Sequence, residues 1–362
     1  MGVLAALAVL AALIVVHEGG HFFAATWQGI RVSSFSIGFG PVLLQRQRRG
    51  VQFALRAIPM GGFVAFPDDD PEGDIAPDDP DLLSNRPAHQ RALVIAAGVL
   101  ANLLFAWLVL FSQTLIYGIP DGINTGAGVM ITHISAGQRA ASAGLRSGER
   151  VLAINGVPLG QGEEAVHRFV AAVQQGAGET LLLRLEGAEG ERSLELVPAE
   201  ANGVGRIGAQ LQPFGSRRYR RRSNAGAWIA QANSGFWQIT SQTLAGYGAL
   251  LTSFAETAPQ VGGPVKIVEL GANLARQGSD SLFLFTALIS INLAVLNALP
   301  LPALDGGQML LLLLEALRGK PLPEAFTEGV TRTGFALLLG LIAVLVVKDT
   351  SQLSVVRQLL GN

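Results

Sequence analysis

Hydrophobic residues are grouped along the chain in four long runs separated by polar segments. The runs cover about Val3–Trp27, Ala92–Ile119, Ser281–Leu299 and Gly334–Val347. A helix needs about 20 mostly apolar residues to cross the hydrocarbon core of a bilayer, and only the last run is clearly shorter. The pattern predicts a polytopic α-helical membrane protein with about four transmembrane helices.

The segment between the second and third runs has a different pattern and predicts a separate domain. Runs of β-forming residues such as VMITHI, RVLAING and TLLLRLE alternate with glycine-rich turns, and EEAVHRFVAAVQQ has helical spacing. We therefore expect an inserted α+β domain at 126–200. It would separate an N-terminal membrane core at 1–119 from a linker and interfacial region at 201–280 and a C-terminal membrane core at 281–362.

The segment Ala227–Ala255 combines aromatic residues with too many polar ones for a lipid-exposed span. We interpret it as an amphipathic helix at the membrane interface, with a fifth crossing as the alternative. The basic run before it, Arg217–Arg222, suits anionic headgroups or a solvated turn. The acidic stretch Phe66–Asp81 is typical of a solvated linker.

Composition supports a membrane protein with a water-exposed part. Of the 362 residues, 49% are hydrophobic and 15% charged, and the net charge of −1 argues against nucleic acid as a partner. The lack of cysteine excludes disulfides and cysteine-bound metal. A secretory signal peptide fits poorly, because no Lys or Arg precedes the first apolar run and no convincing cleavage site follows it.

The stretch VVHEGGHFF places ionisable groups inside the first apolar run. His17 and His21 are four positions apart, so on a helix both imidazoles lie on one face and can bind one Zn²⁺. Glu18, next to the first histidine, is placed to take a proton from a water that zinc activates and to pass it to the departing amine. This arrangement is typical of a zinc peptidase.

The alternative is that an H-E-x-x-H pattern arose by chance on an ordinary surface helix. Insertion of an unpaired ionisable group at membrane depth costs about 2.5–3.5 kcal/mol, so such groups are usually paired or functional. The apolar surroundings of His17, Glu18 and His21 therefore favour the zinc site.

A catalytic zinc site usually needs a third protein ligand. The other histidines are His89 in a loop and His133 and His167 in the inserted domain, where exposed or structural roles are expected. Asp305, in NALPLPALDGG just after the third run, is the better candidate. An N-cap role for Asp305 in the following helix is the alternative.

The directions of the predicted membrane helices allow HEGGH and Asp305 to lie close together. If 227–255 does not cross, the first and third runs point the same way, so HEGGH and Asp305 lie near one membrane face. Pro300 and Pro302 exclude a regular helix there, and Gly306 and Gly307 free the backbone. Irregular backbone at membrane depth is tolerated where it is buried in protein or lines a wet cavity.

With HEGGH and NALPLPALDGG together, the chain resembles the site-2 proteases, intramembrane zinc metalloproteases of the bacterial and plastid branch that carries a PDZ domain. The resemblance implies one zinc per chain, held by His17, His21 and Asp305, with Glu18 as catalytic base. It also implies that Asn297, which opens the second motif, orients substrate or steadies the oxyanion; helix packing is the alternative.

Three further stretches share this resemblance. SIGFGP at 36–41 and RAIPMGGFVAF at 56–66 resemble a membrane-associated β-hairpin beside the active site, where Gly61 and Gly62 would contact substrate. AASAGLRSGERVLAINGVPL resembles a PDZ domain, in which Gly126 and Gly128 are expected to contact a bound peptide end. A strand edge near the metal can hold an unwound substrate segment by strand addition.

The chain departs from the family pattern in three places. Gln308 stands where a histidine often follows LDGG, only one PDZ-like copy fits the length, and AGVLANLLFA lacks a common proline. Asn102 in that stretch is kept, and we expect it to serve interhelical packing.

Positive charge predicts the orientation. The loop after the first run and the loop after the LDG helix both carry basic residues, which places them and the active site near the cytoplasmic face of a bacterial inner membrane or an equivalent organelle membrane. The basic residues are Arg31, Arg46, Arg48, Arg49, Arg56, Arg318, Lys320 and Arg332.

The expected function is cleavage of transmembrane segments in membrane-protein substrates, such as an anti-sigma factor or leftover signal peptides. Two other classes stay open. An inactive membrane-anchored PDZ adaptor would have no use for an intact motif. A zinc transporter would spread polar ligands over several spans and would not need Glu18 as a base.

Overall fold

The computed structural model describes residues 2–69, 75–76, 78–134, 137–187, 190–201, 203–220, 224–254 and 261–352. The chain forms two compact units. The first combines Met1–Tyr117 with Asn224–Asn362, and the second is Gly118–Ser223.

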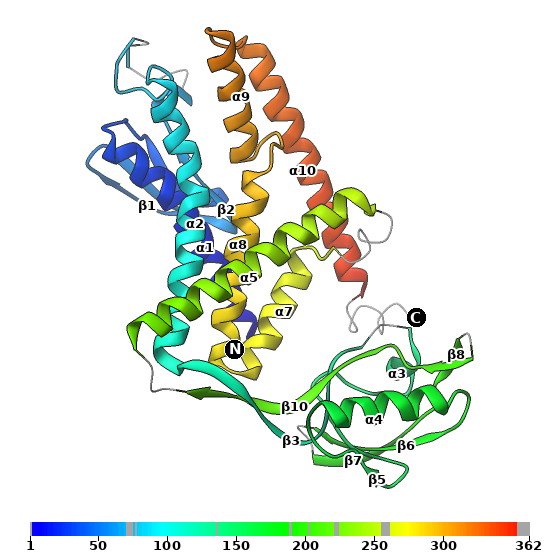
Figure 1. Ribbon diagram of the computed structural model, residues 1–362. Helices are drawn as coiled ribbons and strands as arrows, with labels where there is room; N and C mark the ends of the chain where they lie inside the picture. The colour runs from blue at the N-terminus through cyan, green and yellow to red at the C-terminus, as the bar shows by residue number, and fades with distance from the viewer. Residues whose placement is uncertain are drawn as a thin grey trace. The chain divides into compact units, whose positions relative to one another are not determined.

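The first unit is a helical assembly (Figure 1). Its helices are α1 (Gly2–Trp27), α2 (Ala88–Tyr117), α5 (Ala225–Thr252), α7 (Pro264–Gln277), α8 (Ser279–Ala298), α9 (Asp305–Arg318) and α10 (Glu324–Gln352). Within the described residues, four helices are long and apolar enough to span a membrane: α1, α2, α8 and the Ala325–Ser351 part of α10. This confirms the four predicted spans. The last extends well before Gly334, where polar residues interrupt the hydrophobic pattern without ending the helix.

Small residues let the helices of this unit approach closely. A Cβ atom added to Gly20 of α1 would lie 2.8 Å from the Cβ of Ala101 in α2. Ala106 of α2, Ala232 of α5 and Ala287 of α8 are almost fully buried in one apolar cluster. Close backbone approach through Gly and Ala is how membrane helices pack where water supplies no hydrophobic driving force.

Helix α5 runs obliquely across α2 and α8 (Figure 1). Trp107 of α2 donates a hydrogen bond from Nε1 to Asn233 Oδ1 of α5 at 2.7 Å. Among the described residues, α5 is not one of the helices apolar enough to span. Its location at the membrane interface stays a prediction.

An ion pair joins α2 to α9 at the end of the unit where HEGGH lies. Arg91 near the start of α2 contacts Glu315 in the last turns of α9 at 3.0 Å. The loops after α1 and after α9 therefore emerge at the same end of the bundle. This agrees with the parallel directions expected for α1 and α8.

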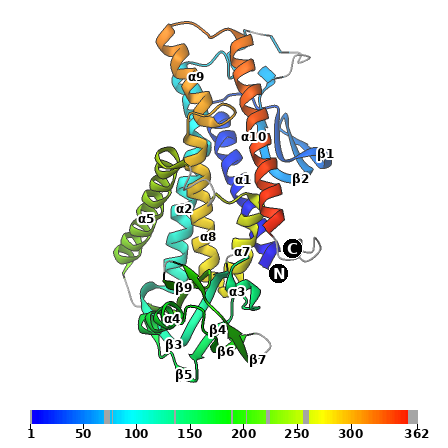
Figure 2. The same ribbon diagram turned by 90° about the vertical axis from the view of Figure 1, so that its right-hand side faces the viewer.

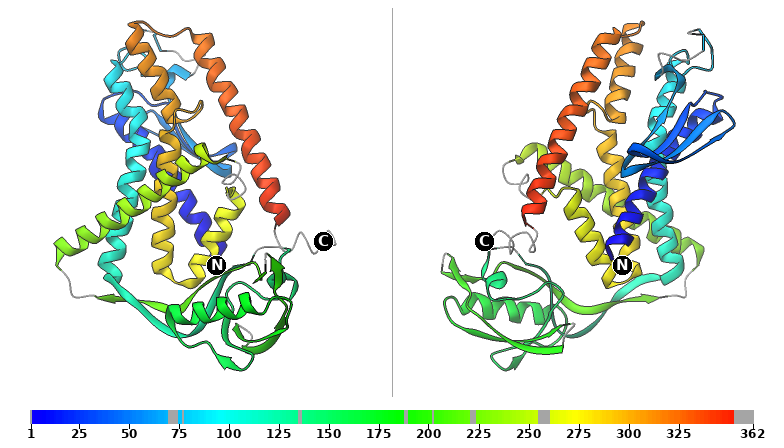
Figure 3. Two further views of the ribbon diagram at one scale, coloured as in Figure 1. Left: turned by 45° about the vertical axis from the view of Figure 1, so that its right-hand side comes forward. Right: turned by 180° about the vertical axis from the view of Figure 1, so that it is seen from behind.

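A β-hairpin follows α1. Strands β1 (Ser34–Arg48) and β2 (Val51–Ala65) pair antiparallel, and a short 3₁₀ helix, η1, follows at Pro67–Asp69. Arg49 and Gly50 connect the strands with φ of 51° and 83°, the positive values that a two-residue type I′ turn requires. The hairpin packs on α1 through the ring of Phe22, and Figures 2 and 3 show it alongside this helix.

The second unit is an α+β domain. Its main sheet has the order β10-β3-β4-β6-β7, β5 pairs with β4, and β8 pairs with β9. The elements are β3 (Ile119–Ile134), α3 (Arg139–Ser142), β4 (Arg150–Ile154), β5 (Val157–Pro158), α4 (Gly162–Gln175), β6 (Leu181–Gly187), β7 (Gly190–Leu196), β8 (Ala199–Ala201), β9 (Val204–Arg206) and β10 (Ala209–Arg220). Phe169 of α4 is fully buried against the sheet.

This unit is larger than the 126–200 expected. Strand β10 pairs with β3 from Ala209 opposite Ile134 to Arg220 opposite Ile119, so most of the described residues between 201 and 220 form strands rather than a linker. The basic run begins inside β10, and Arg221 and Arg222 lie outside the described residues. The last part of the linker and interfacial region expected at 201–280 is also helical, because it contains α7.

Candidate active site

The two motif histidines lie one turn apart on α1 and face α2. His17 is 8% exposed, and its Nε2 is 3.4 Å from Nε2 of His21. The two rings meet edge to face, with centroids 4.9 Å apart. An (i, i+4) pair on one helix therefore converges on a single point, as the spacing predicts.

Asp305 joins this pair from the other half of the unit. Its Oδ2 is 3.4 Å from His17 Nε2 and 3.5 Å from His21 Nε2. The helix cap of α9 is Leu304, so Asp305 is the first helical residue and does not fill the N-cap position considered above. An irregular segment between α8 and α9, with Ala303 at φ of 70°, delivers the carboxylate to the histidines.

The three atoms fit a tetrahedral zinc ion. Ligand bonds of 2.0–2.1 Å at tetrahedral angles separate two ligand atoms by about 3.3–3.4 Å, and the three observed separations are 3.4, 3.4 and 3.5 Å. Asp305 Oδ2 is buried and has no hydrogen-bond partner within the described part of the chain. A buried oxygen without a donor is costly unless a cation binds it.

The other three histidines of the chain lie on elements other than those of His17, His21 and Asp305. Among the described residues, His17, His21 and Asp305 are the one group of three or more His, Asp or Glu residues close enough to share an ion. His89 lies at the start of α2, His133 in β3 and His167 in α4. The three residues singled out from the sequence are therefore the ones that the fold brings together.

Glu18 is partly buried and faces the hairpin. A Cβ atom added to Gly62 of β2 would lie 3.0 Å from Glu18 Cγ and 3.1 Å from the Ile14 side chain. Gly61, with φ of 89°, lies against the ring of Phe39. The hairpin thus covers the helix face that carries the proposed base, although substrate contact by these glycines stays a prediction.

Asn297, in the last turn of α8, also lies beside the candidate zinc ligands. It is 8% exposed, and its Nδ2 is 3.4 Å from His17 Nε2. Gln308 of α9 is exposed. In the second unit, Gly126 lies under the ring of Phe214, and Gly128 donates its backbone N–H to Gly160 at 2.7 Å. Peptide binding by these two glycines remains a prediction.

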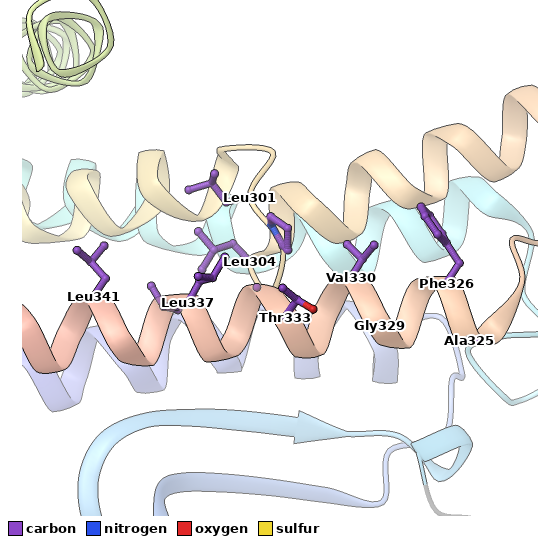
Figure 4. Close-up of a pocket in the computed structure, with 12 residues that line it drawn as sticks. Leu301, Leu304, Ala325, Phe326, Gly329, Val330, Thr333, Leu337 and Leu341 are labelled. Carbon is purple, nitrogen blue, oxygen red and sulfur yellow. The ribbon is translucent and has the colours of Figure 1, made fainter.

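An apolar groove of about 630 Å³ lies beside the segment that carries Asp305. Leu301, Pro302 and Leu304 form one wall and residues of α10, including Phe326 and Leu337, form the other (Figure 4). Gly334 of α10 allows this close approach, because an added Cβ would contact Pro302. The position of α10 therefore supports the loop that carries Asp305, the candidate third ligand.

The contribution of α2 was not foreseen from the sequence. His21 Nδ1 lies 2.8 Å from the carbonyl oxygen of Val94, so its N–H donates there and leaves Nε2 free for a metal. Gly98 sits beneath both rings: an added Cβ would be 2.6 Å from Cε1 of His21 and 2.7 Å from Cε1 of His17. In the structure Val94, Gly98 and Asn102 form a buried row at intervals of four, whereas the sequence shows Gly98 and Asn102 only as small or polar positions in an apolar helix.

We expect Gly98→Ala to weaken zinc binding by about 10-fold or more, the scale seen when groups that support metal ligands are altered. The added methyl group would displace both imidazoles. Zinc retained after equilibration with a competing chelator measures the effect. Gly19→Ala is the matched control: it lies inside the motif, yet its added Cβ meets no described atom within 4 Å, so zinc binding should be retained. Equal zinc affinity in both variants would contradict the steric argument.

The comparisons with known proteins agree with this geometry. The model of Peptidase family M50 matches residues 5–341. A protein of Nostoc sp. named as a zinc metalloprotease is 48% identical over 98% of this chain and 97% of its own length. The membrane metalloprotease ARASP, chloroplastic, of Arabidopsis thaliana is 41% identical over 99% and 80%. The regulator of sigma-E protease RseP of Salmonella typhimurium is 28% identical over 95% and 97%.

A His-His-Asp set with zinc-like spacing thus occurs in a chain that matches one peptidase family from residue 5 to residue 341. The chain belongs to peptidase family M50, the zinc-dependent site-2 proteases, and is a membrane metalloendopeptidase.

Proposed function

We propose that the protein cleaves transmembrane segments of membrane-protein substrates at the site formed by His17, Glu18, His21 and Asp305. The observation that supports this proposal best is the triangle of ligand atoms with edges of 3.4–3.5 Å. Its two histidines lie on α1, a helix long and apolar enough to span a membrane, and Asp305 lies shortly after α8, another such helix. An inactive adaptor would not need this set to be intact. A transporter would not need Glu18 beside it.

The residues have separate roles in this proposal. His17, His21 and Asp305 hold zinc, which when bound lowers the pKa of water and polarises the scissile carbonyl group. Glu18 takes the proton of the attacking water and gives it to the amine nitrogen as the C–N bond breaks. Asn297 donates from its amide to the carbonyl oxygen as negative charge develops there. Its proximity to His17 Nε2 supports this role.

The hairpin supplies a place for substrate. A transmembrane helix has its peptide groups hydrogen-bonded internally, so it must unwind before its carbonyl can be attacked. The outer edge of a two-stranded sheet can pair with the unwound segment by strand addition. Close packing of Gly62 near Glu18 supports the hairpin as a membrane-associated substrate holder, with Gly61 and Gly62 near the path of the chain.

The second unit is proposed to be a PDZ-like domain. Its antiparallel sheet with the packed helix α4 supports this assignment, and the expected partner is an exposed peptide end of a substrate. Gly126 and Gly128 are proposed to contribute to that binding. A domain of this kind can admit substrates that have already been trimmed.

We place the active site near the cytoplasmic face. The basic loops after α1 and after α9 lie at one end of the bundle, and positively charged loops tend to stay in the cytoplasm. The membrane would be a bacterial inner membrane or an equivalent organelle membrane. An anti-sigma factor or a leftover signal peptide is the proposed kind of substrate, a choice that the name of the Salmonella relative supports.

The test is cleavage of a model single-span substrate by the full chain in detergent, with the cut site located by mass spectrometry. We expect about one zinc per chain, a cut inside the spanning segment, loss of cleavage after zinc is removed by 1,10-phenanthroline, and recovery when zinc is restored. Cleavage confined to water-exposed loops, or cleavage that persists without metal, would refute the proposal.

A further inference from the structure

One face of α2 forms the surroundings of both histidines. Val94, Gly98 and Asn102 are buried and follow each other at intervals of four, so they lie in a row along the helix. Val94 meets His21 through its carbonyl oxygen, and Gly98 leaves room for both rings. Asn102, the third member, is fully buried and lies against His17.

The contact between Asn102 and His17 involves the ring nitrogen that does not face Asp305. The Asn102 amide nitrogen is 3.2 Å from His17 Nδ1, whereas His17 Nε2 is the atom 3.4 Å from Asp305 Oδ2. A neutral imidazole that binds metal through Nε2 carries its proton on Nδ1. The partner of Nδ1 must then accept a hydrogen bond, which an amide N–H cannot do.

The amide oxygen of Asn102 can supply that acceptor. Oδ1 is buried and has no hydrogen-bond partner among the residues that the structure describes. The oxygen and nitrogen of an amide occupy nearly equivalent positions, so a half-turn of the amide exchanges them. The exchange pairs the lone oxygen with Nδ1–H of His17 and gives this histidine the same kind of support that Val94 gives His21.

The backbone of Asn102 is also held in place. Ser290 of α8, itself fully buried, donates from Oγ to the carbonyl oxygen of Asn102 at 2.8 Å. Asn102 thus contacts α8 through its backbone oxygen, while its side-chain amide stays at His17. A group that only filled space between helices would not need an amide aimed at a metal ligand.

We propose that Asn102 is a positioning residue, whose Oδ1 accepts the Nδ1–H of His17 and so fixes the tautomer that presents Nε2 to zinc. This inference rests on the proposed zinc-binding role of His17. Groups in such positions typically change metal affinity by about 10- to 100-fold when they are removed.

The test compares Asn102→Leu, which keeps the size but has no acceptor, with Asn102→Asp, which keeps an oxygen. Zinc affinity is measured on the full chain in detergent by competition with a chelator. We expect Leu to weaken zinc binding by about 10- to 100-fold and Asp to stay within a few-fold of wild type. Ser290→Ala is the matched control, since it loosens the same helix contact without touching His17, and it should keep wild-type affinity.

A second measurement reads the tautomer directly and does not depend on catalysis. The chain has only five histidines, so nitrogen NMR of ¹⁵N-histidine-labelled protein, assigned with His17→Gln, can follow His17. In zinc-free protein we expect the Nδ1–H tautomer in wild type and a shift toward Nε2–H in Asn102→Leu.

The outcomes separate the two proposals. Wild-type zinc affinity in Asn102→Leu, equal weakening by Leu, Asp and Ser290→Ala, or an unchanged tautomer would overturn the role of Asn102 and leave only packing. Failure of the wild-type chain to bind zinc would instead overturn the proposed function itself.

Discussion

Replacement of Glu18 by glutamine is expected to abolish cleavage while the protein keeps its zinc. Glutamine has nearly the same size but cannot take a proton from water, and loss of a general base typically costs about 10²–10⁴ in rate. The ligand atoms on His17, His21 and Asp305 are untouched, so metal content should stay at about one ion per chain. The measurement is kcat/KM on a single-span substrate together with zinc content on the same sample.

The control for this substitution is Glu269→Gln. Glu269 is an exposed glutamate on α7 in the same unit, so the change removes one negative charge away from the site. It should leave both cleavage and zinc content at wild-type values. Cleavage by Glu18→Gln at more than about one tenth of the wild-type rate would show that another group serves as the base.

The membrane helices and the location of the site could be predicted because both depend on short-range patterns in the sequence. Long apolar runs identify helices, an (i, i+4) pair faces one way, and two spans in the same direction bring HEGGH and Asp305 to one end. The structure shows these three side chains within reach of one ion. The glycine and proline residues around Asp305 correctly indicated irregular backbone before α9.

The extent of the second unit could not be predicted in the same way. Strand β10 begins at Ala209 and pairs with β3, whose paired residues lie 75 to 101 positions earlier, and no local pattern specifies so distant a partner. Its end carries Arg217, Arg218 and Arg220, for which the sequence predicts a solvated turn or contact with lipid headgroups. In the structure Arg218 donates to the backbone oxygen of Asp121 in β3 at 2.7 Å, so at least this charge stabilises the sheet.

The surroundings of the histidines were missed for a related reason. The sequence indicates Asn102 and Gly98 only as small or polar positions in an apolar helix, which helix packing alone explains. Their relation to the metal site depends on the rotation of α2 against α1, and that rotation is set by contacts such as Gly20 against Ala97 and Ala101. Interhelical geometry of this kind has no signature within a single helix.

Replacement of Asp305 by alanine is expected to remove zinc and activity together, in contrast to Glu18→Gln. Two histidines alone leave the ion without its anionic ligand, so we expect zinc affinity to fall by about 100-fold or more and cleavage to become undetectable at buffered low zinc. Asp349→Ala is the matched control. It is another buried aspartate of this unit, and its Oδ2 accepts the backbone N–H of Lys266 at 3.0 Å.

Loss of that contact should lower the thermal stability of Asp349→Ala, because the first turn of α7 loses its acceptor, but it should leave one zinc per chain. Zinc content after chelator competition should therefore fall in Asp305→Ala, whereas the midpoint of thermal unfolding should fall in Asp349→Ala. If Asp305→Ala keeps its zinc, the third ligand is another group, and the distances of 3.4 and 3.5 Å to the histidines reflect a charge contact between the side chains rather than a shared metal ion.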